Sequence, residues 1–168
     1  MSVLPRGAAG RNRWSFLKQP DGYVLREGDM CDVEVVYRLN RHCFDSCWSV
    51  DAIYSALESG CDLLLCEHDN ELAGYLLTMS ILDEVQVLQI AVDERFRRQG
   101  LAEAMTQELI ERRSGISKII LEVRASNRAA RMLYGKLGFI ESGCRKNYYG
   151  PDVHGLYEDA ILMDLKVA

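Results

Sequence analysis

Residues 85–102 read VQVLQIAVDERFRRQGLA, and the architecture of the chain follows from this stretch. Apolar and polar residues alternate up to Val87, but the alternation resumes at Leu88, so its phase slips by one residue. A β-bulge inserts one residue in this way and leaves backbone groups unpaired, often beside a functional site. A strand buried on both faces would give the same pattern without a bulge. The stretch therefore predicts a strand from Val85 to Val92, with or without a bulge near its middle.

A helix follows this strand. Leu101, Met105 and Leu109 recur at i, i+4 and i+8, the spacing of a helical face turned toward a core. Glu103 in the first turn suits the helix dipole, and Gly115 provides a stop at the other end. We therefore expect one helix between Leu101 and Gly115.

The segment RRQGLA, at the start of that helix, is a candidate anion-binding site. The first N–H groups of a helix have no partner inside it and attract negative charge. Gly100 permits close approach of the backbone to a ligand, while Arg97 and Arg98 add positive charge. No GK[ST] follows, so the segment is not a nucleotide P-loop. The alternative is that the arginines are ordinary surface residues.

The same reasoning places the other elements. The order β-α-α-β-β-β-α-β-α-β-β predicts an α/β (α+β) domain with a mixed sheet and helices on its faces. The remaining predicted elements are strands from Tyr23 to Gly28, Cys61 to Cys66, Leu72 to Leu82, Lys118 to Arg124, Phe139 to Tyr148 and Tyr157 to Val167, a helix capped by Asp29 that runs to about Phe44, a helix from Val50 to Glu58 capped by Ser49, and a helix capped by Ser126 and closed by Gly138.

Length and composition limit the class of protein. The chain has 168 residues, within the roughly 100–200 of one domain. A hydrophobic content of 48% excludes a disordered chain, and no apolar run approaches the ~18 residues of a membrane span. The net charge of -5 argues against direct binding of nucleic acid. Residues 1–20 hold four basic and no acidic side chains, so we expect a flexible basic tail before a domain over 21–168.

The six cysteines predict neither a disulfide framework nor a metal site. None forms a CxxC motif, and the cluster of His42, Cys43 and Cys47 lacks the second half that zinc spacing requires. The first residues contain no apolar stretch of the kind found in a secretion signal. We therefore expect free thiols and a cytoplasmic location, while the reactivity of Cys47 stays open.

Three segments together resemble one known family. The strand ending LQIAVD, the RRQGLA helix start and ILEVRASNRAARMLYGKLGF (residues 120–139) closely resemble the GNAT superfamily of N-acetyltransferases. Within it, EVRASN, LYGKLGF, RKNYY and YEDAILM look most like the ribosomal-protein-alanine N-acetyltransferases of the RimI type. The resemblance spans about Tyr23 to Leu165. It implies a central, mostly antiparallel sheet that is splayed between its fourth and fifth strands and flanked by about four helices.

The resemblance also implies a site with acetyl-CoA as co-substrate and no metal. The family's general base corresponds to Glu122 and its general acid to Tyr134. A cofactor-contacting asparagine corresponds to Asn127. The bulged strand supplies backbone partners for the pantetheine arm and the following loop binds the pyrophosphate; these positions are Ile90, Ala91 and Val92, then Arg97, Arg98, Gln99, Gly100, Leu101, Ala102 and Glu103.

Each of these residues also has a purely structural interpretation. Glu122 could be solvated or paired with Arg124, which lies on the same strand face. Tyr134 lies on an apolar helix face and could be a core tyrosine. Asn127 could belong to the start of the helix. The functional interpretation is favoured because all these residues fit one site and follow one another in the order of the family.

The acetyl transfer chemistry agrees with these residue types. A free α-amine has a pKa of about 7.7–8.0, so a sizeable fraction is neutral near pH 7, whereas a lysine amine near 10.4 is almost wholly charged. A modest base such as Glu122 would serve an α-amine, and Tyr134 can protonate the leaving thiolate. No cysteine nucleophile is needed, so we expect direct transfer without an acyl-enzyme.

The resemblance places the acceptor peptide between two segments. They are the loop around Phe44 and Trp48 and the strand holding Tyr148 and Tyr149. Aromatic side chains with polar tips suit an extended peptide, although Phe44 and Trp48 could also be core residues. The chain departs from the family pattern at Cys47 and Glu94, where the family usually has proline.

The sequence as a whole predicts an enzyme. We expect acetyl transfer from acetyl-CoA to a protein N-terminal α-amine, with the alanine of a small-subunit ribosomal protein as the acceptor that the resemblance implies, and a monomeric enzyme that binds neither nucleic acid nor membrane. The alternatives are acetylation of another amine, namely a different N-terminus, a lysine or a polyamine, and a non-catalytic module that binds acyl-CoA.

Overall fold

The computed structural model describes residues 20–112 and 115–167. The predicted basic tail therefore lies outside the described residues except for Pro20, and so do residues 113–114 near the predicted end of the third helix.

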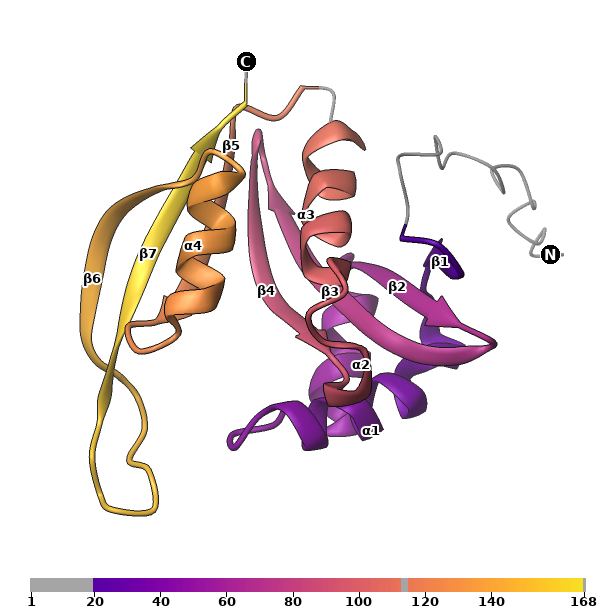
Figure 1. Cartoon of the computed structure of the whole chain (residues 1–168), viewed down its shortest axis with the longest axis horizontal. Coiled ribbons are helices and arrows are strands. Elements are labelled where there is room, and N and C mark those ends of the chain that lie inside the picture. Colours follow the sequence, from indigo (N-terminus) through magenta and orange to yellow (C-terminus); the bar gives the residue numbers. More distant parts are fainter. Residues whose placement is uncertain (1–19, 113–114, 168) are drawn as a thin grey trace, which may run out of the picture.

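The described residues form seven strands and four α-helices in the predicted order (Figure 1). The predicted ends of the strands agree with the observed ones to within two residues. The elements are β1 (Tyr23–Glu27), η1 (Met30–Asp32), α1 (Val33–Cys43), α2 (Val50–Glu58), β2 (Asp62–His68), β3 (Glu71–Ile81), β4 (Glu84–Val92), η2 (Glu94–Phe96), α3 (Leu101–Arg112), β5 (Lys118–Arg124), α4 (Arg128–Lys136), β6 (Ile140–Tyr149) and β7 (Glu158–Lys166), where η marks a 3-10 turn.

The strands form one sheet in the order β1-β2-β3-β4-β5-β7-β6, with β1 and β6 at its two edges (Figure 1). All neighbours are antiparallel except β4 and β5, which run parallel. These two strands pair only from Glu84 with Lys118 to Gln86 with Ile120, and beyond Gln86 they separate. The predicted splay between the fourth and fifth strands is confirmed.

The predicted bulge lies in β4. Leu77 of β3 pairs with Gln89, but the next residue, Thr78, pairs with Val87, so Leu88 is the extra residue. Of the two interpretations of the phase slip, the bulge is correct and the regular two-sided strand is wrong. The insertion returns the apolar residues after it to the face that carried them before it.

Each face of the sheet carries its own core. One core holds α3 and α4, and we call this side the α3–α4 face; the other holds α1 and α2, and we call it the α1–α2 face. The alternation along β2 shows how one strand serves both: Leu63 and Leu65 pack against α1 and α2, whereas Leu64 and Cys66 pack on the opposite side.

Of the three predicted helix caps, two agree with the structure and one differs. Asp29 accepts a hydrogen bond from the N–H of Cys31 in a capping box, although a 3-10 turn intervenes before α1, and Ser49 caps α2 as expected. The prediction for α4 is wrong, because Asn127 and not Ser126 is the cap. Its side chain accepts from the N–H of Ala130 at 3.1 Å. The N–H of Ser126 donates instead to Glu158 of β7 at 2.7 Å, which draws the loop to the sheet.

Gly74 of β3 gives a test of the packing that supports β4. A Cβ atom there would lie 2.8 Å from the carbonyl oxygen of Ala91 and 3.1 Å from Cε of Met105. We expect Gly74→Ala to lower the free energy of unfolding, measured by urea titration, by about 1–3 kcal/mol through overpacking.

Gly135 of α4 is the matched control, since its added Cβ would meet nothing within 4 Å. We expect Gly135→Ala to raise the free energy of unfolding by roughly 0.5–1 kcal/mol, as usual in a helix interior. Equal effects of the two substitutions would contradict the close approach at Gly74.

Candidate active site

The free edge of β4 supplies unpaired backbone groups. The N–H of Asp93 donates to the carbonyl of Ala73 in β3 at 2.8 Å. Because the direction of backbone groups alternates along a strand, Ala91 also turns its N–H and C=O toward β3, whereas those of Ile90 and Val92 turn toward the gap. Of the three predicted backbone partners, Ile90 and Val92 are therefore placed at the gap and Ala91 is held by its partner strand.

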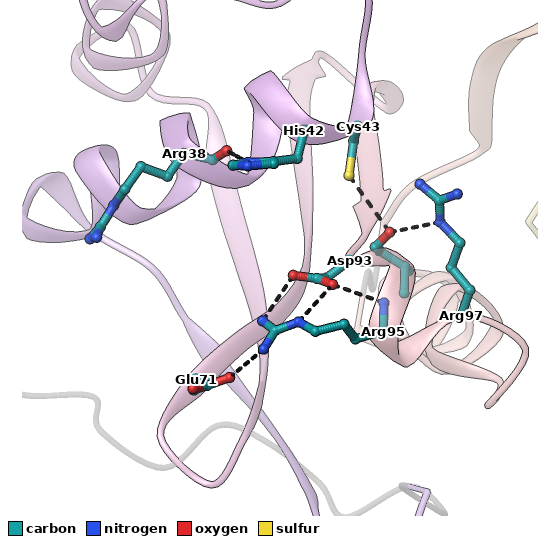
Figure 2. Close-up of polar contacts among 8 residues, drawn as sticks. Arg38, His42, Cys43, Glu71, Asp93, Arg95 and Arg97 are labelled. Atoms are coloured by element: carbon teal, nitrogen blue, oxygen red, sulfur yellow. Dashed lines mark hydrogen bonds and ion pairs between the residues drawn. The ribbon is translucent and has the colours of Figure 1, made fainter.

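The carbonyl of Val92 at this edge already has two donors in the protein. Cys43 Sγ and Arg97 Nε donate to it over 3.6 and 3.2 Å (Figure 2). Burial, the largest effect, raises the pKa of the Cys43 thiol, so that the thiol keeps its proton and can donate. These contacts join the end of α1 to the loop after β4.

A cavity of about 750 Å³ opens beside this edge. All predicted cofactor-binding residues line it except Gln99, and Tyr134 and Phe44 line it as well. The residues that sequence analysis missed are Cys43, Phe96, Ala129, Ala130 and Leu133. Ala130 and Leu133 could have been found, because they share a helix face with Tyr134, the predicted general acid.

The start of α3 presents free amide groups to one end of the cavity. Gly100 has φ +82° and Arg98 has φ +66°, so the loop takes a tight left-handed course just before the helix. The first N–H of the helix region with a carbonyl partner is that of Ala104, which donates to Gly100 at 2.9 Å. Within the described residues, the N–H groups of Leu101 to Glu103 have no such partner. These amides and the two arginines fit a diphosphate, and the apolar wall of the cavity fits an uncharged arm.

Two side chains predicted to bind the cofactor have structural partners. Gln99 Oε1 accepts from Tyr23 at 2.7 Å, which ties the loop to β1. Glu103, which lines the cavity, accepts from Lys136 of α4 at 2.7 Å and so joins α3 to α4.

The turn after β4 is anchored by charge. Asp93 forms two hydrogen bonds with the guanidinium of Arg95, which also reaches Glu71 at 3.0 Å (Figure 2). The hydrogen bond from Arg95 is the main reason that the pKa of Asp93 is lowered. The turn thus sets the direction in which the chain enters the RRQGLA segment.

Tyr134 of α4 lies in the wall of the cavity. It is 5% exposed and packs against Phe139, with 5.7 Å between ring centres. Its hydroxyl forms no hydrogen bond within residues 20–112 and 115–167, and burial raises its pKa to about 12. The structure therefore shows a protonated, unengaged hydroxyl facing the cavity at neutral pH.

Glu122 of β5 lies on the other side of the sheet. Its neighbours Leu121 and Val123 belong to the core of the α3–α4 face, so Glu122 points to the α1–α2 face. It is not part of the cavity wall. Its carboxylate pairs with Arg145 of β6 at 2.9 Å. The expected alternative, a pair with Arg124, is wrong, because Arg124 pairs with Glu158 at 3.1 Å.

The predicted acceptor residues surround Glu122 only in part. Interaction with the Glu122 carboxylate raises the pKa of Tyr148, and the Tyr148 ring meets that of Tyr149 edge-on, with 5.2 Å between the ring centres. Phe44 instead lies at the cavity, at the end of α1. Trp48 is half-buried, and its backbone N–H donates to Asn40 Oδ1 at 2.8 Å.

Among residues 20–112 and 115–167, no three His, Cys, Asp or Glu side chains are placed to hold a metal ion. None of the helices described there is both long and apolar enough to span a bilayer.

Comparison with known proteins gives one consistent family. The chain is 43% identical over 102 residues to the [ribosomal protein bS18]-alanine N-acetyltransferase of Escherichia coli K12, which covers 60% of this chain and 68% of that protein. The enzyme of the same name from Haemophilus influenzae is 32% identical over 143 residues, covering 83% of this chain and 96% of that protein. The crystal structure of the E. coli ribosomal-protein-S18-alanine N-acetyltransferase superposes with a TM-score of 0.82 at 33% identity, over 87% of this chain and 94% of that one.

The sequence profile of the Acetyltransferase (GNAT) family matches residues 33–139, which include β4, the RRQGLA segment, Glu122 and Tyr134. More distant neighbours of the same fold have been solved with acetyl-CoA. The chain therefore belongs to the GNAT family of acetyltransferases, with acetyl-CoA as its co-substrate.

Proposed function

We propose that this enzyme acetylates the N-terminal α-amine of a protein, and that the acceptor is the terminal alanine of ribosomal protein bS18. The observation that carries the proposal is the name shared by the E. coli and H. influenzae relatives, one of which matches 83% of this chain. The acidic net charge of -5 agrees with a basic acceptor, because opposite charges speed encounter. We further propose that the enzyme acts in the cytoplasm as a monomer and does not bind nucleic acid.

The gap in the sheet supports a division of the site into a donor side and an acceptor side. Tyr134 lies on the α3–α4 face, whereas Glu122 points to the α1–α2 face. The cavity beside the gap is lined from both faces, by Tyr134 on one and by Phe44 and Ala91 on the other. Donor and acceptor would then meet between β4 and β5. Such an arrangement leaves each substrate its own entrance.

Glu122 and Tyr134 would act as base and acid from opposite sides. Acetyl-CoA supplies the acetyl group as a thioester. Glu122 accepts the proton that the attacking amine loses, directly or through water, and Tyr134 donates a proton to the sulfur as its bond to the acetyl carbon breaks. Arg145 and Tyr148 hold the Glu122 carboxylate beside the gap.

The burial of Tyr134 decides when its proton can move. A tyrosine with a pKa of about 12 is a weak acid toward a thiolate near 8.5, and complete transfer beforehand would cost about 5 kcal/mol. We therefore propose that the proton moves as negative charge develops on the sulfur. The unengaged hydroxyl supports this role, since no internal hydrogen bond must break first.

Two short peptides test the proposed function. One has a free N-terminal alanine and no lysine, and the other is blocked at its N-terminus and contains one lysine. We expect mass spectrometry after incubation with acetyl-CoA to find an added acetyl group on the first peptide alone. Acetylation of the second alone would move the enzyme to the lysine class. If neither reacts, a small amine acceptor or a non-catalytic acyl-CoA module replaces the proposal.

Tyr134→Phe tests the acid. The substitution removes only an unengaged hydroxyl, so we expect kcat to fall at least tenfold while the Kd for acetyl-CoA and the stability stay within twofold and about 0.5 kcal/mol of the wild type. Tyr54→Phe, at a 43% exposed position on α2, is the control.

The pH profile of the wild type tests the same residue. A pKa raised from about 10 to about 12 keeps the acid form present, so we expect kcat to stay level between pH 8.5 and roughly 10.5. Halving of kcat near pH 10 through the loss of one proton would show a titrating acid of ordinary pKa and contradict the assignment.

Glu122→Gln tests the base, with Arg145→Gln as its matched control. Both changes break the same ion pair, but only the first removes the carboxylate. We expect Glu122→Gln to lower kcat/KM about tenfold or more at pH 7 and less at pH 9, where the α-amine is already neutral. A defect of equal size at both pH values, or an equal defect in Arg145→Gln, would remove Glu122 from this role.

A further inference from the structure

A buried polar network joins α1 to β4 on the α1–α2 face. Asn40 is completely buried, and its Nδ2 donates to the Tyr75 hydroxyl at 2.6 Å and to Gln89 Oε1 at 2.8 Å. The Tyr75 hydroxyl donates to the same Gln89 oxygen at 2.9 Å. The N–H of Trp48 donates to Asn40 Oδ1 at 2.8 Å. The network therefore ties the loop around Trp48 to the middle of β4.

The backbone contact from Trp48 fixes the direction of every other bond in the network. A backbone N–H can only donate, so the Asn40 atom that receives it is the oxygen, and the other end of the amide is the donor. Asn40 then donates to Tyr75, whose hydrogen goes to Gln89. Burial raises the pKa of Tyr75, so its hydroxyl stays protonated. The oxygen of Gln89 is thus committed, and its NH₂ group must point the other way.

This NH₂ group is free and reachable. In residues 20–112 and 115–167, Gln89 Nε2 has no hydrogen-bond partner, and it is not shut off from solvent. Both hydrogens are therefore available to an incoming acceptor atom. The two hydrogen bonds to its oxygen, from Asn40 and Tyr75, hold the side chain in one orientation, so little entropy is lost on binding.

Gln89 directly precedes Ile90 and Ala91 of the cavity wall, although it is not itself part of that wall. It follows the bulged Leu88 and pairs with Leu77, which belongs to the core of the α1–α2 face. Ala91, two residues later on the same face, is part of the cavity wall. Across the gap, Glu122 points to this face from β5. Gln89 and Glu122 thus border the gap from its two sides.

We propose that Gln89 Nε2 donates a hydrogen bond to the carbonyl oxygen of the acceptor's first residue and so selects N-terminal α-amines. The carbon that bears an α-amine also bears a carbonyl, whereas a lysine ε-amine or a polyamine nitrogen is followed by methylene groups. One fixed donor beside the reacting nitrogen therefore separates the two classes of acceptor. This inference rests on the proposed N-terminal acceptor and names the residue that recognises it.

The experiment pairs a change in the enzyme with a change in the peptide. The peptides are an alanine-starting acceptor and the same peptide with an E-alkene in place of its first peptide bond, which lacks the first carbonyl. The variants are Gln89→Met, which removes the donor, and Gln89→Glu, which keeps an oxygen for Asn40 and Tyr75 but removes the NH₂ group. Gln86→Glu places the same charge on β4 before the bulge and is the control.

For the wild type and Gln86→Glu, we expect loss of the carbonyl to lower kcat/KM about three- to tenfold, the net effect of one hydrogen bond. For both Gln89 variants, we expect kcat/KM on the normal peptide to fall by a similar factor. Loss of the carbonyl from the peptide should then lower kcat/KM no further. The KM for acetyl-CoA stays unchanged. The alkene also changes the basicity of the terminal amine. This effect cancels, because each peptide is compared between the wild-type enzyme and the variants.

The outcomes separate the two proposals. If loss of the first carbonyl lowers kcat/KM by the same factor in the wild type and in Gln89→Glu, Gln89 does not contact that carbonyl. The proposal of N-terminal acetylation would still stand. A rise in the KM for acetyl-CoA instead would place the amide against the donor and overturn the inference. If the wild type modifies only the lysine peptide, the proposed function fails and the inference with it. Should Gln89→Met fail to fold, Gln89→Glu still decides.

Discussion

Two parallel strands that start side by side and then separate impose the main constraint on this structure. Each backbone N–H and C=O on the facing edges of β4 and β5 loses its ladder partner beyond Gln86. Unpaired backbone groups inside a protein are costly, so something must take the place of the missing ladder. In this chain part of the need is met internally, since Arg97 and Cys43 both donate to Val92. The backbone groups that remain unpaired on these edges are available to bind substrates.

The arrangement of the helices follows from the same gap. Because α3 and α4 cover one face and α1 and α2 the other, the gap is the opening in the sheet that connects the two faces. Backbone amides without a carbonyl partner lie at the start of α3, while the buried Asn40 network lies on the opposite face. The division of labour that we propose between Tyr134 and Glu122 is therefore a consequence of topology and does not depend on the two residues being neighbours.

Sequence reasoning could reach the parts of this structure that depend on local pattern. The phase slip at Leu88 pointed to a bulge as one of two interpretations, helix spacing predicted α3, and the family resemblance identified most of the cavity wall. It failed where the outcome depended on which side chains meet across elements. The cap of α4 went to Asn127 because Glu158, far along the chain, took the N–H of Ser126. The Glu122 pair with Arg145 likewise needed the register of β6, β7 and β5.

The extra residue in β4 also limits how this sequence can diverge over time. Deleting a single residue from the strand would turn every later side chain to the opposite face, so the length of β4 is effectively frozen. The loop between β6 and β7 is under no such restriction, because residues 150–157 are all exposed and stand clear of the sheet (Figure 1). Insertions and deletions can accumulate there. The β6–β7 hairpin can thus change in length while the geometry of β4 and its bulge stays fixed.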